Sequence, residues 1–249
     1  MEVISTMGGT LTYSDGNHRY DWNGEKVDLS VSKIANCYPL DFGIASGWAA
    51  KVIRQTLIQT LEEGRTEIES LEPWAKQICK APHYVTKRAA DVGTAVHRYA
   101  EALGHGLQPD LSDDPDIKKC QKTLGEWFQK NIKEVIDVER RLYSPKWKIA
   151  GTLDMLACLH TNQIHILDFK GCTDLNTGIK AAQVGQLTAY RSMAEEAGER
   201  IDGCTLVRFS RANGEVHAVT LKNHKENVAA FEAALHLARY KPEVGEFQR

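Results

Sequence analysis

The spacing of apolar residues changes once along this chain, near Val135, and that change limits the folds it can adopt. Before it, from about Gly43 to Asn131, apolar residues recur at helical spacing and predict helices over 49–61, 71–79, 84–103 and 115–132. After it, short apolar runs predict the order strand–strand–strand–helix–strand–strand–helix. This order is typical of an α/β (α+β) fold, with a mixed central sheet flanked by helices and a helix-rich N-terminal half.

We expect one domain over residues 1–249, built in three parts. A β-hairpin segment over 1–42 is indicated by strand-like runs around Gly16 and by the turn dipeptide Asn23-Gly24. A helical part follows over 43–134, and a sheet with its flanking helices occupies 135–249. Strands are predicted over 138–143, 150–159, 164–169, 204–209 and 215–221, and the later helices over 179–197 and 226–240.

The composition excludes several classes of protein. No apolar run approaches the roughly 18 residues of a membrane helix, and no secretion signal is visible, so we expect a cytoplasmic protein with no membrane partner. The net charge of −2 means that any surface that binds nucleic acid must be local. The six cysteines are scattered without a C-x-x-C pair, which argues against a zinc ribbon or an iron–sulfur cluster. Cys158, His160 and His165 could hold a metal, although polar side chains on two neighbouring strands explain them better.

Two carboxylates and a lysine lie at the ends of two neighbouring predicted strands. Asp154 follows Gly151-Thr152-Leu153, and Asp168 ends an apolar run two residues before Lys170. Strand side chains alternate between faces, so Asp168 and Lys170 should share one face and Phe169 should point to the other. Carboxylate oxygens suit Mg²⁺ or Mn²⁺, and a lysine can offset the charge that builds up during phosphodiester hydrolysis. Asp-x-Lys alone is a common tripeptide, so the flanking motifs decide its meaning.

Four short motifs follow one another over about two-fifths of the chain. They are Gly93-Thr94-Ala95-Val96-His97 with Glu101, Gly151-Thr152-Leu153-Asp154, Asp168-Phe169-Lys170, and Gln186 with Tyr190. The ordered set resembles the RecB-like branch of the PD-(D/E)XK nucleases, which includes phage exonucleases and CRISPR-associated RecB-like nucleases. A looser likeness to the phage exonucleases lies in the residues 18–24, 30–32 and 48–50.

The resemblance implies a restriction-endonuclease-like core and a role for each matching residue. The implied metal ligands are His97, Asp154, Asp168 and the backbone carbonyl of Phe169. Lys170 would position or activate the attacking water. Gln186 and Tyr190 are expected to contact DNA or brace Lys170. Glu101 is expected to orient His97.

The implied activity is that of a Mg²⁺- or Mn²⁺-dependent deoxyribonuclease, an exonuclease rather than an endonuclease. Its expected setting is recombination or replication of a phage or mobile element in the cytoplasm of a bacterial host. DNA, single- or double-stranded and with free ends, would be the substrate, and a single-strand annealing or recombination protein is a further expected partner. Many CRISPR-associated members carry cluster cysteines near the C-terminus, whereas the last cysteine here is Cys204, so no iron–sulfur cluster is expected.

DNA contacts outside the pocket are expected from two groups of basic residues, although a solvated surface is the commoner explanation for each. One group lies on the predicted helix over 115–132 and its end, and the other on the first hairpin: Lys118, Lys119, Lys122, Lys130 and Lys133, and Arg140, Arg141, Lys146 and Lys148. Aromatic side chains that could stack on unpaired bases are Trp22, Tyr38 and Trp147, with packing the likelier role of any one.

Two other functions stay open. One is a restriction-type endonuclease on the same core, which a separate recognition domain would favour. The other is a catalytically inactive nucleic-acid-binding or assembly protein, against which the complete set of Asp154, Asp168 and Lys170 argues.

Overall fold

The computed structural model describes residues 2–6, 9–38, 42–63 and 71–241. The chain divides into two compact units, one made of residues 1–38 and 96–249 and the other of residues 39–95. The boundary between them falls inside one long helix, α4 (Ala81–Gly104).

A five-stranded sheet forms the centre of the first unit. Its strands, in spatial order, are β5 (Ile132–Ser144), β6 (Ile149–Leu159), β7 (Ile164–Cys172), β8 (Gly203–Ser210) and β9 (Val216–Thr220). Strands β7 and β8 are parallel, and every other neighbouring pair is antiparallel. The sheet is therefore mixed, as the sequence predicts, and it agrees with a restriction-endonuclease-like core.

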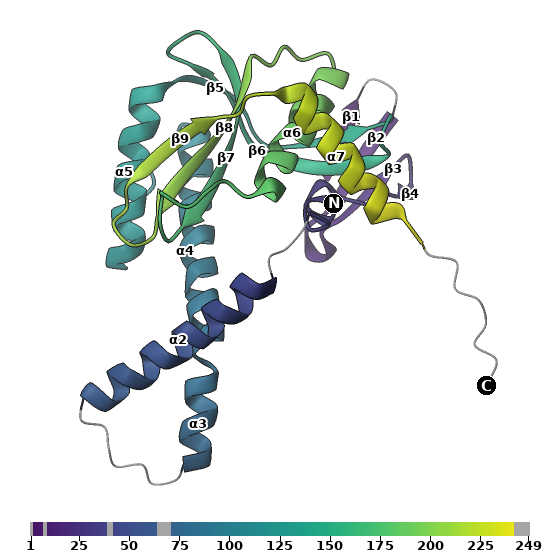
Figure 1. Ribbon diagram of the computed structural model, residues 1–249. Helices are drawn as coiled ribbons and strands as arrows, with labels where there is room; N and C mark the ends of the chain where they lie inside the picture. The colour runs from purple at the N-terminus through teal and green to yellow at the C-terminus, as the bar shows by residue number, and fades with distance from the viewer. Residues whose placement is uncertain (1, 7–8, 39–41, 64–70, 242–249) are drawn as a thin grey trace, which may run out of the picture. The chain divides into compact units, whose positions relative to one another are not determined.

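Helices cover both faces of this sheet (Figure 1). On one face lie α1 (Val31–Ala35), α6 (Ala181–Glu196) and α7 (His224–Arg239), around a core that includes Leu153, Ile166, Leu187, Leu206 and Phe231. On the other lies α5 (Pro115–Asn131), together with the end of α4, where Gly104 meets Val138 and Met155. The prediction of a mixed sheet flanked by helices is confirmed.

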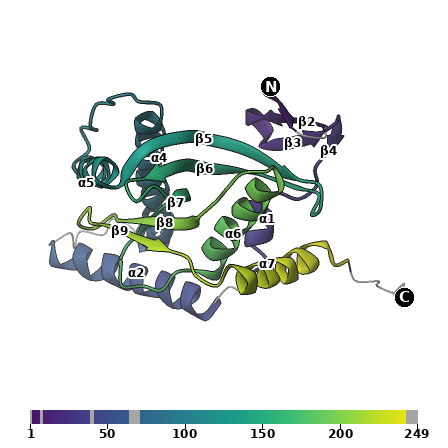
Figure 2. The ribbon, with the colours of Figure 1, turned by 90° about the horizontal axis from the view of Figure 1, so that it is seen from above.

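The N-terminal segment is a second, smaller sheet rather than one hairpin. Its antiparallel strands are β1 (Glu2–Thr6), β2 (Gly9–Ser14), β3 (Arg19–Trp22) and β4 (Glu25–Lys26), with a short 3₁₀ helix, η1 (Asp15–Asn17), between β2 and β3. Asn23 and Gly24 connect β3 to β4 with φ values of 51° and 83°, as the predicted turn requires. The sheet lies beside the β5–β6 hairpin (Figure 2), where the Tyr20 and Thr152 hydroxyls are 2.7 Å apart.

The second unit is helical, in agreement with the sequence. It contains α2 (Phe42–Glu62), α3 (Leu71–Cys79) and the first part of α4. Gly64, which follows the helix predicted over 49–61, lies outside the described residues. Pro82 stands in the first turn of α4, where a proline is tolerated because the backbone N–H has no partner. No helix in the described part of the chain is long and apolar enough to cross a membrane.

Gly151 permits a close approach between the sheet and two helices. A Cβ atom at this position would lie 2.7 Å from Cε1 of Tyr190 on α6 and 2.8 Å from Cγ2 of Val31 on α1. Both distances are shorter than van der Waals contact, so a side chain would push both helices away from β6. The glycine of the Gly-x-x-Asp motif therefore has a packing role.

Gly151→Ala should lower the free energy of unfolding by about 1–3 kcal/mol, because the added methyl group overpacks the junction. Urea unfolding measures the change. Gly178→Ala is the matched control, since no atom lies within 4 Å of its Cβ position, and it should change stability by less than about 0.5 kcal/mol. Equal stability of the two variants would contradict the close packing at Gly151.

Candidate active site

The two central strands stop pairing where the candidate site begins. The β6–β7 ladder runs from Cys158 opposite Ile164 to Met155 opposite Leu167. Beyond it, the Phe169 N–H donates to Oδ2 of Asp154 over 3.0 Å. The Asp154 side chain thus occupies the place of a main-chain acceptor, which fixes this carboxylate against the backbone between Asp168 and Lys170.

Asp168 and Lys170 make a direct ion pair beside it. Lys170 Nζ donates to Asp168 Oδ1 over 2.7 Å, and Asp168 is only 1% exposed. The other oxygen, Oδ2, is buried and has no hydrogen-bond partner among the residues that the structure describes. An unpartnered buried carboxylate oxygen is costly, so this atom marks a place where a cation or donor would be stabilising.

The charges around this pair shift its ionisation. Burial and the nearby Asp154 raise the pKa of Asp168, and Lys170 opposes that rise without cancelling it. Burial acts to lower the pKa of Lys170, but Asp168 and Asp154 outweigh it and raise that pKa. The lysine is therefore held as an ammonium, and the carboxylates are left with more negative charge than it neutralises.

His97 reaches the site from the end of α4. Its Nδ1 is 3.5 Å from Oδ2 of Asp154, and its ring packs edge-on against Phe169 with centroids 6.2 Å apart. Phe169 therefore points toward α4, and strand alternation turns Asp168 and Lys170 to the other face, as expected. Glu101, one turn further along α4, makes no hydrogen bond or ion pair with His97 in the described structure, so its proposed orienting role stays a prediction.

Glu139 is a third carboxylate at the site that the motifs did not reveal. It stands across from Asp154, between the pairs Val138–Met155 and Arg140–Leu153 of the β5–β6 ladder, with a φ of 51°. Its side chain is exposed to solvent, but the protein atoms packed around its carboxyl group and the charges of Asp154 and Glu101 together raise the pKa of Glu139 to about 7. Glu139 comes to lie near Asp154 through the pairing register of β5 with β6, and the sequence around Glu139 does not reveal that register.

Gln186 and Tyr190 face the site from α6. Gln186 Nε2 donates to the Tyr190 hydroxyl over 3.2 Å, and Tyr190 is buried. Burial raises the pKa of Tyr190 well above its usual value, and Asp154 and Asp168 add to the rise against the effect of Gln186. Tyr190 is therefore a neutral phenol, and it lies close enough to both aspartates for their charges to raise its pKa.

Other predicted residues lie outside this cluster. Lys118 and Lys122 are exposed on α5, Arg140 pairs with Glu199 over 2.9 Å, and Arg141 lies over the Tyr13 ring at 4.5 Å. The three aromatic candidates are used in packing: Trp147 is buried, Trp22 stacks on Tyr143, and Tyr38 lies against Gly185.

The second candidate metal group does not converge. His165 is buried with its Nδ1 2.8 Å from the Thr205 hydroxyl, and His160 Nε2 lies near the Gln129 carbonyl. More generally, no three His, Cys, Asp or Glu side chains within 2–6, 9–38, 42–63 and 71–241 come together at one metal position as they stand.

Arg208 is a second residue that the motifs missed. It stands opposite Lys170 in the β7–β8 ladder and is buried. Its guanidinium donates to the carbonyls of Asp174, Leu175 and Thr177 and to the Thr177 hydroxyl, at 2.9–3.4 Å. These bonds hold the loop that joins β7 to α6. The sequence feature that could have revealed Arg208 is its place as a single arginine inside the apolar run of β8.

Arg208→Met should destabilise the protein by about 2–3 kcal/mol, because the loop carbonyls lose a charged donor. It should also speed proteolytic cleavage between residues 173 and 178. Urea unfolding and limited proteolysis measure the two effects. Arg200→Met, at a side chain that is 80% exposed, is the control and should change neither. A wild-type cleavage rate in Arg208→Met would show that the loop does not depend on this arginine.

Glu139 should make stability depend on pH. Its pKa rises from an ordinary value of 4.5 to about 7 on folding, so the folded state binds the proton more tightly. Its contribution is then most favourable below pH 4.5 and is lost as the pH rises through about 7. Glu139→Gln removes this loss, and it should raise the melting temperature at pH 8 more than at pH 4.5. Glu134→Gln, exposed on the same strand, should show no such difference, and identical pH profiles for both variants would contradict the crowding at Glu139.

Comparisons with known proteins identify no family. No protein-family model and no curated protein matches this sequence. Among solved structures, a protein named SSO0001 is similar at 12% identity over 87% of this chain and 78% of its own, with a TM-score of 0.39. A candidate exonuclease from Eubacterium rectale is similar at 11% identity over 59% of this chain and 67% of its own, with a TM-score of 0.40. Function is therefore argued from the site itself.

Proposed function

We propose that this protein is a Mg²⁺- or Mn²⁺-dependent deoxyribonuclease. The observation that carries the proposal is the ion pair of the buried Asp168 with the partly exposed Lys170, with Asp154 and His97 beside it. A binding module has no need of a carboxylate that is buried with one oxygen unpartnered. Perturbed carboxylates of this kind concentrate at catalytic sites.

The donor set fits a hard divalent cation. Two carboxylates, an imidazole and a main-chain carbonyl are ligands that Mg²⁺ and Mn²⁺ accept, and here they would be Asp154, Asp168, His97 and Phe169. The unpartnered Oδ2 of Asp168 and the raised pKa of that carboxyl both point to missing positive charge. A bound metal would polarise the scissile phosphate and lower the pKa of a water molecule.

The chain's own groups have separable tasks. Lys170, kept protonated by Asp168, can donate to the attacking water or to a phosphate oxygen and offset the charge of the transition state. Tyr190 stays neutral and can donate without adding charge, while Gln186 fixes its hydroxyl. The Phe169 N–H holds Asp154 in place, so this carboxylate is oriented before substrate arrives.

The finer part of the proposal concerns the substrate. The resemblance to phage exonucleases favours DNA with free ends, in recombination or replication of a phage or mobile element, and a single-strand annealing protein as partner. The scattered cysteines favour activity without an iron–sulfur cluster.

Lys170→Ala, Asp168→Asn and Asp154→Asn should each reduce DNA cleavage by at least about 100-fold, because Lys170 would donate to the reacting groups and the two carboxylates would hold the metal. Circular dichroism and the melting temperature establish that the variants fold. Lys222→Ala, at an exposed position away from the cluster, should cleave like wild type. Near-wild-type cleavage by any one of the three would remove that residue from the mechanism.

End-labelled linear duplex and covalently closed circular DNA, each with Mg²⁺, Mn²⁺ or EDTA, test the activity itself. We expect the linear DNA to be degraded with either metal and not in EDTA, and the closed circle to survive. Cutting of the closed circle would make the protein an endonuclease. Binding without cleavage under every condition would favour the inactive alternative, and an iron-containing preparation would contradict the interpretation of the cysteines.

A further inference from the structure

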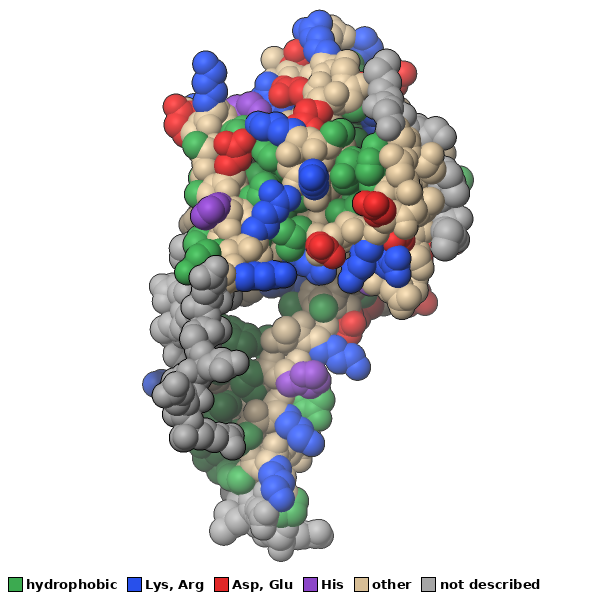
Figure 3. All heavy atoms as spheres, turned by 90° about the vertical axis from the view of Figure 1, so that its right-hand side faces the viewer, with side chains coloured by type: hydrophobic (Ala, Val, Ile, Leu, Met, Phe, Trp, Pro, Cys, Tyr) green, Lys and Arg blue, Asp and Glu red, His purple; other side chains and the backbone are tan. Residues whose placement is uncertain are grey.

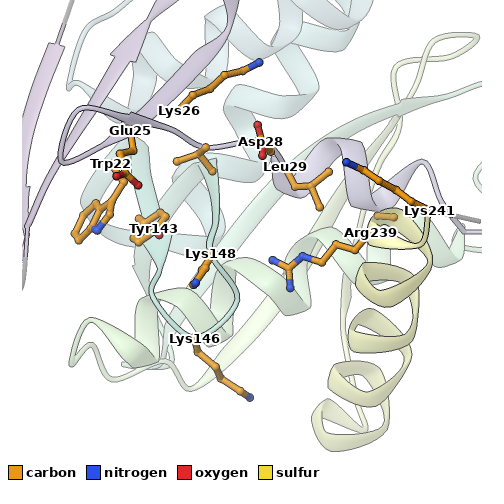
Figure 4. A pocket seen from close by; sticks show the side chains of 12 residues that line it. Trp22, Glu25, Lys26, Asp28, Leu29, Tyr143, Lys146, Lys148, Arg239 and Lys241 are labelled. Atoms are coloured by element: carbon orange, nitrogen blue, oxygen red, sulfur yellow. The ribbon is translucent and has the colours of Figure 1, made fainter. Parts of the chain in front are cut away.

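A cavity of about 820 Å³ lies away from the carboxylate cluster, within the first unit (Figure 4). Three segments that are distant in sequence enclose it: the stretch around β4, the turn between β5 and β6, and the end of α7. Its lining residues are Trp22, Glu25, Lys26, Val27, Asp28, Leu29, Tyr143, Lys146, Lys148, Ala238, Arg239 and Lys241.

The lining carries a clear excess of positive charge. Five of its side chains are basic and two are acidic, in a chain whose net charge is −2. On the face shown in Figure 3, Lys and Arg side chains lie among acidic and hydrophobic ones. The excess of positive charge is confined to the cavity lining, and it is local, as a polyanion site in an acidic protein must be.

Three of the five basic side chains have no partner in the part of the chain that the structure describes. Lys146 pairs with Glu232 over 3.0 Å, and Arg239 donates to the Trp147 carbonyl. Lys26, Lys148 and Lys241, by contrast, make no side-chain hydrogen bond or ion pair with any residue that the structure describes. They come one from each segment, so folding brings together three ammonium groups that no side chain among the described residues pairs with.

Apart from the acidic residues Glu25 and Asp28, the remaining wall is apolar and aromatic. Trp22 stacks on Tyr143 with ring centroids 4.1 Å apart, and Val27, Leu29 and Ala238 add aliphatic surface. An anion with flat or apolar groups between its charges would use both kinds of wall. A single DNA strand alternates phosphates with sugars and exposed bases, and the bases can stack on aromatic side chains, which the carboxylates of an acidic peptide cannot do.

The cavity and the candidate active site share one hairpin. Tyr143 follows Glu139 by four residues on β5, about 13 Å at the usual rise of a strand. A strand with its end among the carboxylates could therefore reach the cavity within a few nucleotides. We propose that this cavity binds the backbone of single-stranded DNA next to the active site; the inference rests on the proposed nuclease function and adds a holding site to it.

The test compares two charge reversals of equal size in the full chain. Lys26→Glu with Lys148→Glu alters the cavity. Lys222→Glu with Lys225→Glu alters exposed residues at the opposite end of α7, about 20 Å along the helix from Arg239. Fluorescence anisotropy in EDTA measures binding of a labelled single strand of about 20 nucleotides at several salt concentrations. Melting temperatures establish that both variants fold.

We expect the cavity variant to bind the single strand about tenfold more weakly. The slope of the logarithm of the binding constant against the logarithm of the salt concentration should become less steep by about 0.7 for each lost phosphate contact. The control alters the net charge by the same amount at a distance from the cavity, so it should change binding by less than about twofold. Equal losses in the two variants, or no loss in either, would overturn the proposal. Competition by polyglutamate as strong as by unlabelled DNA at equal charge would overturn the assignment to DNA.

Hydrolysis of thymidine 5′-(p-nitrophenyl phosphate), too short to reach the cavity, separates this inference from the proposed function. The cavity variant should hydrolyse it like wild type. Absence of hydrolysis by wild type, with cavity-dependent binding intact, would overturn the nuclease assignment and leave the binding site standing. Loss of hydrolysis in the folded cavity variant would show that its residues belong to the catalytic site, and would overturn the separate holding site.

Discussion

Asp168 is almost completely buried in the middle of β7, whose parallel neighbour, β8, is buried along its whole length. A carboxylate in such a place is tolerated only with a cation close by, and Lys170 supplies it over 2.7 Å. The ammonium is in turn held by a carboxylate, so neither group can be removed without leaving the other's charge buried. This pair lies in β7 where its pairing with β6 has stopped, and the separation of β6 from β7 lets Asp154 accept a hydrogen bond from the Phe169 amide.

The same arrangement leaves the site with unfavourable electrostatics. Asp154, Asp168 and Glu139 crowd one lysine, and burial raises the pKa of both Asp168 and Glu139. A site built for stability alone would replace one of these carboxylates, since natural proteins keep such strain mainly where function uses it. A divalent cation bound by these carboxylates would offset their mutual repulsion, and this would explain why they lie so close together. The loop anchored by Arg208 then keeps α6 close to the cluster.

Sequence reasoning succeeded where the relevant pattern is local. Strand alternation related Asp168 to Lys170, and helical and strand periodicities gave the order of the central elements. It missed Glu139 because that residue reaches Asp154 through the register of β5 on β6 at a left-handed backbone position. It missed the role of Arg208 because the partners are loop carbonyls, which carry no signature in the side-chain sequence. Lys26, Lys148 and Lys241 lie too far apart in the chain for any motif to group them.

The central claim is that Asp168 keeps one oxygen free for a metal ion. Isothermal titration of Mn²⁺ into wild type, Asp168→Asn and Glu134→Gln tests it without depending on catalysis. We predict that wild type and Glu134→Gln bind Mn²⁺ alike, and that Asp168→Asn, shown to be folded by its melting temperature, binds at least about tenfold more weakly because an anionic ligand is lost. Equal Mn²⁺ affinity for wild type and Asp168→Asn would contradict the account.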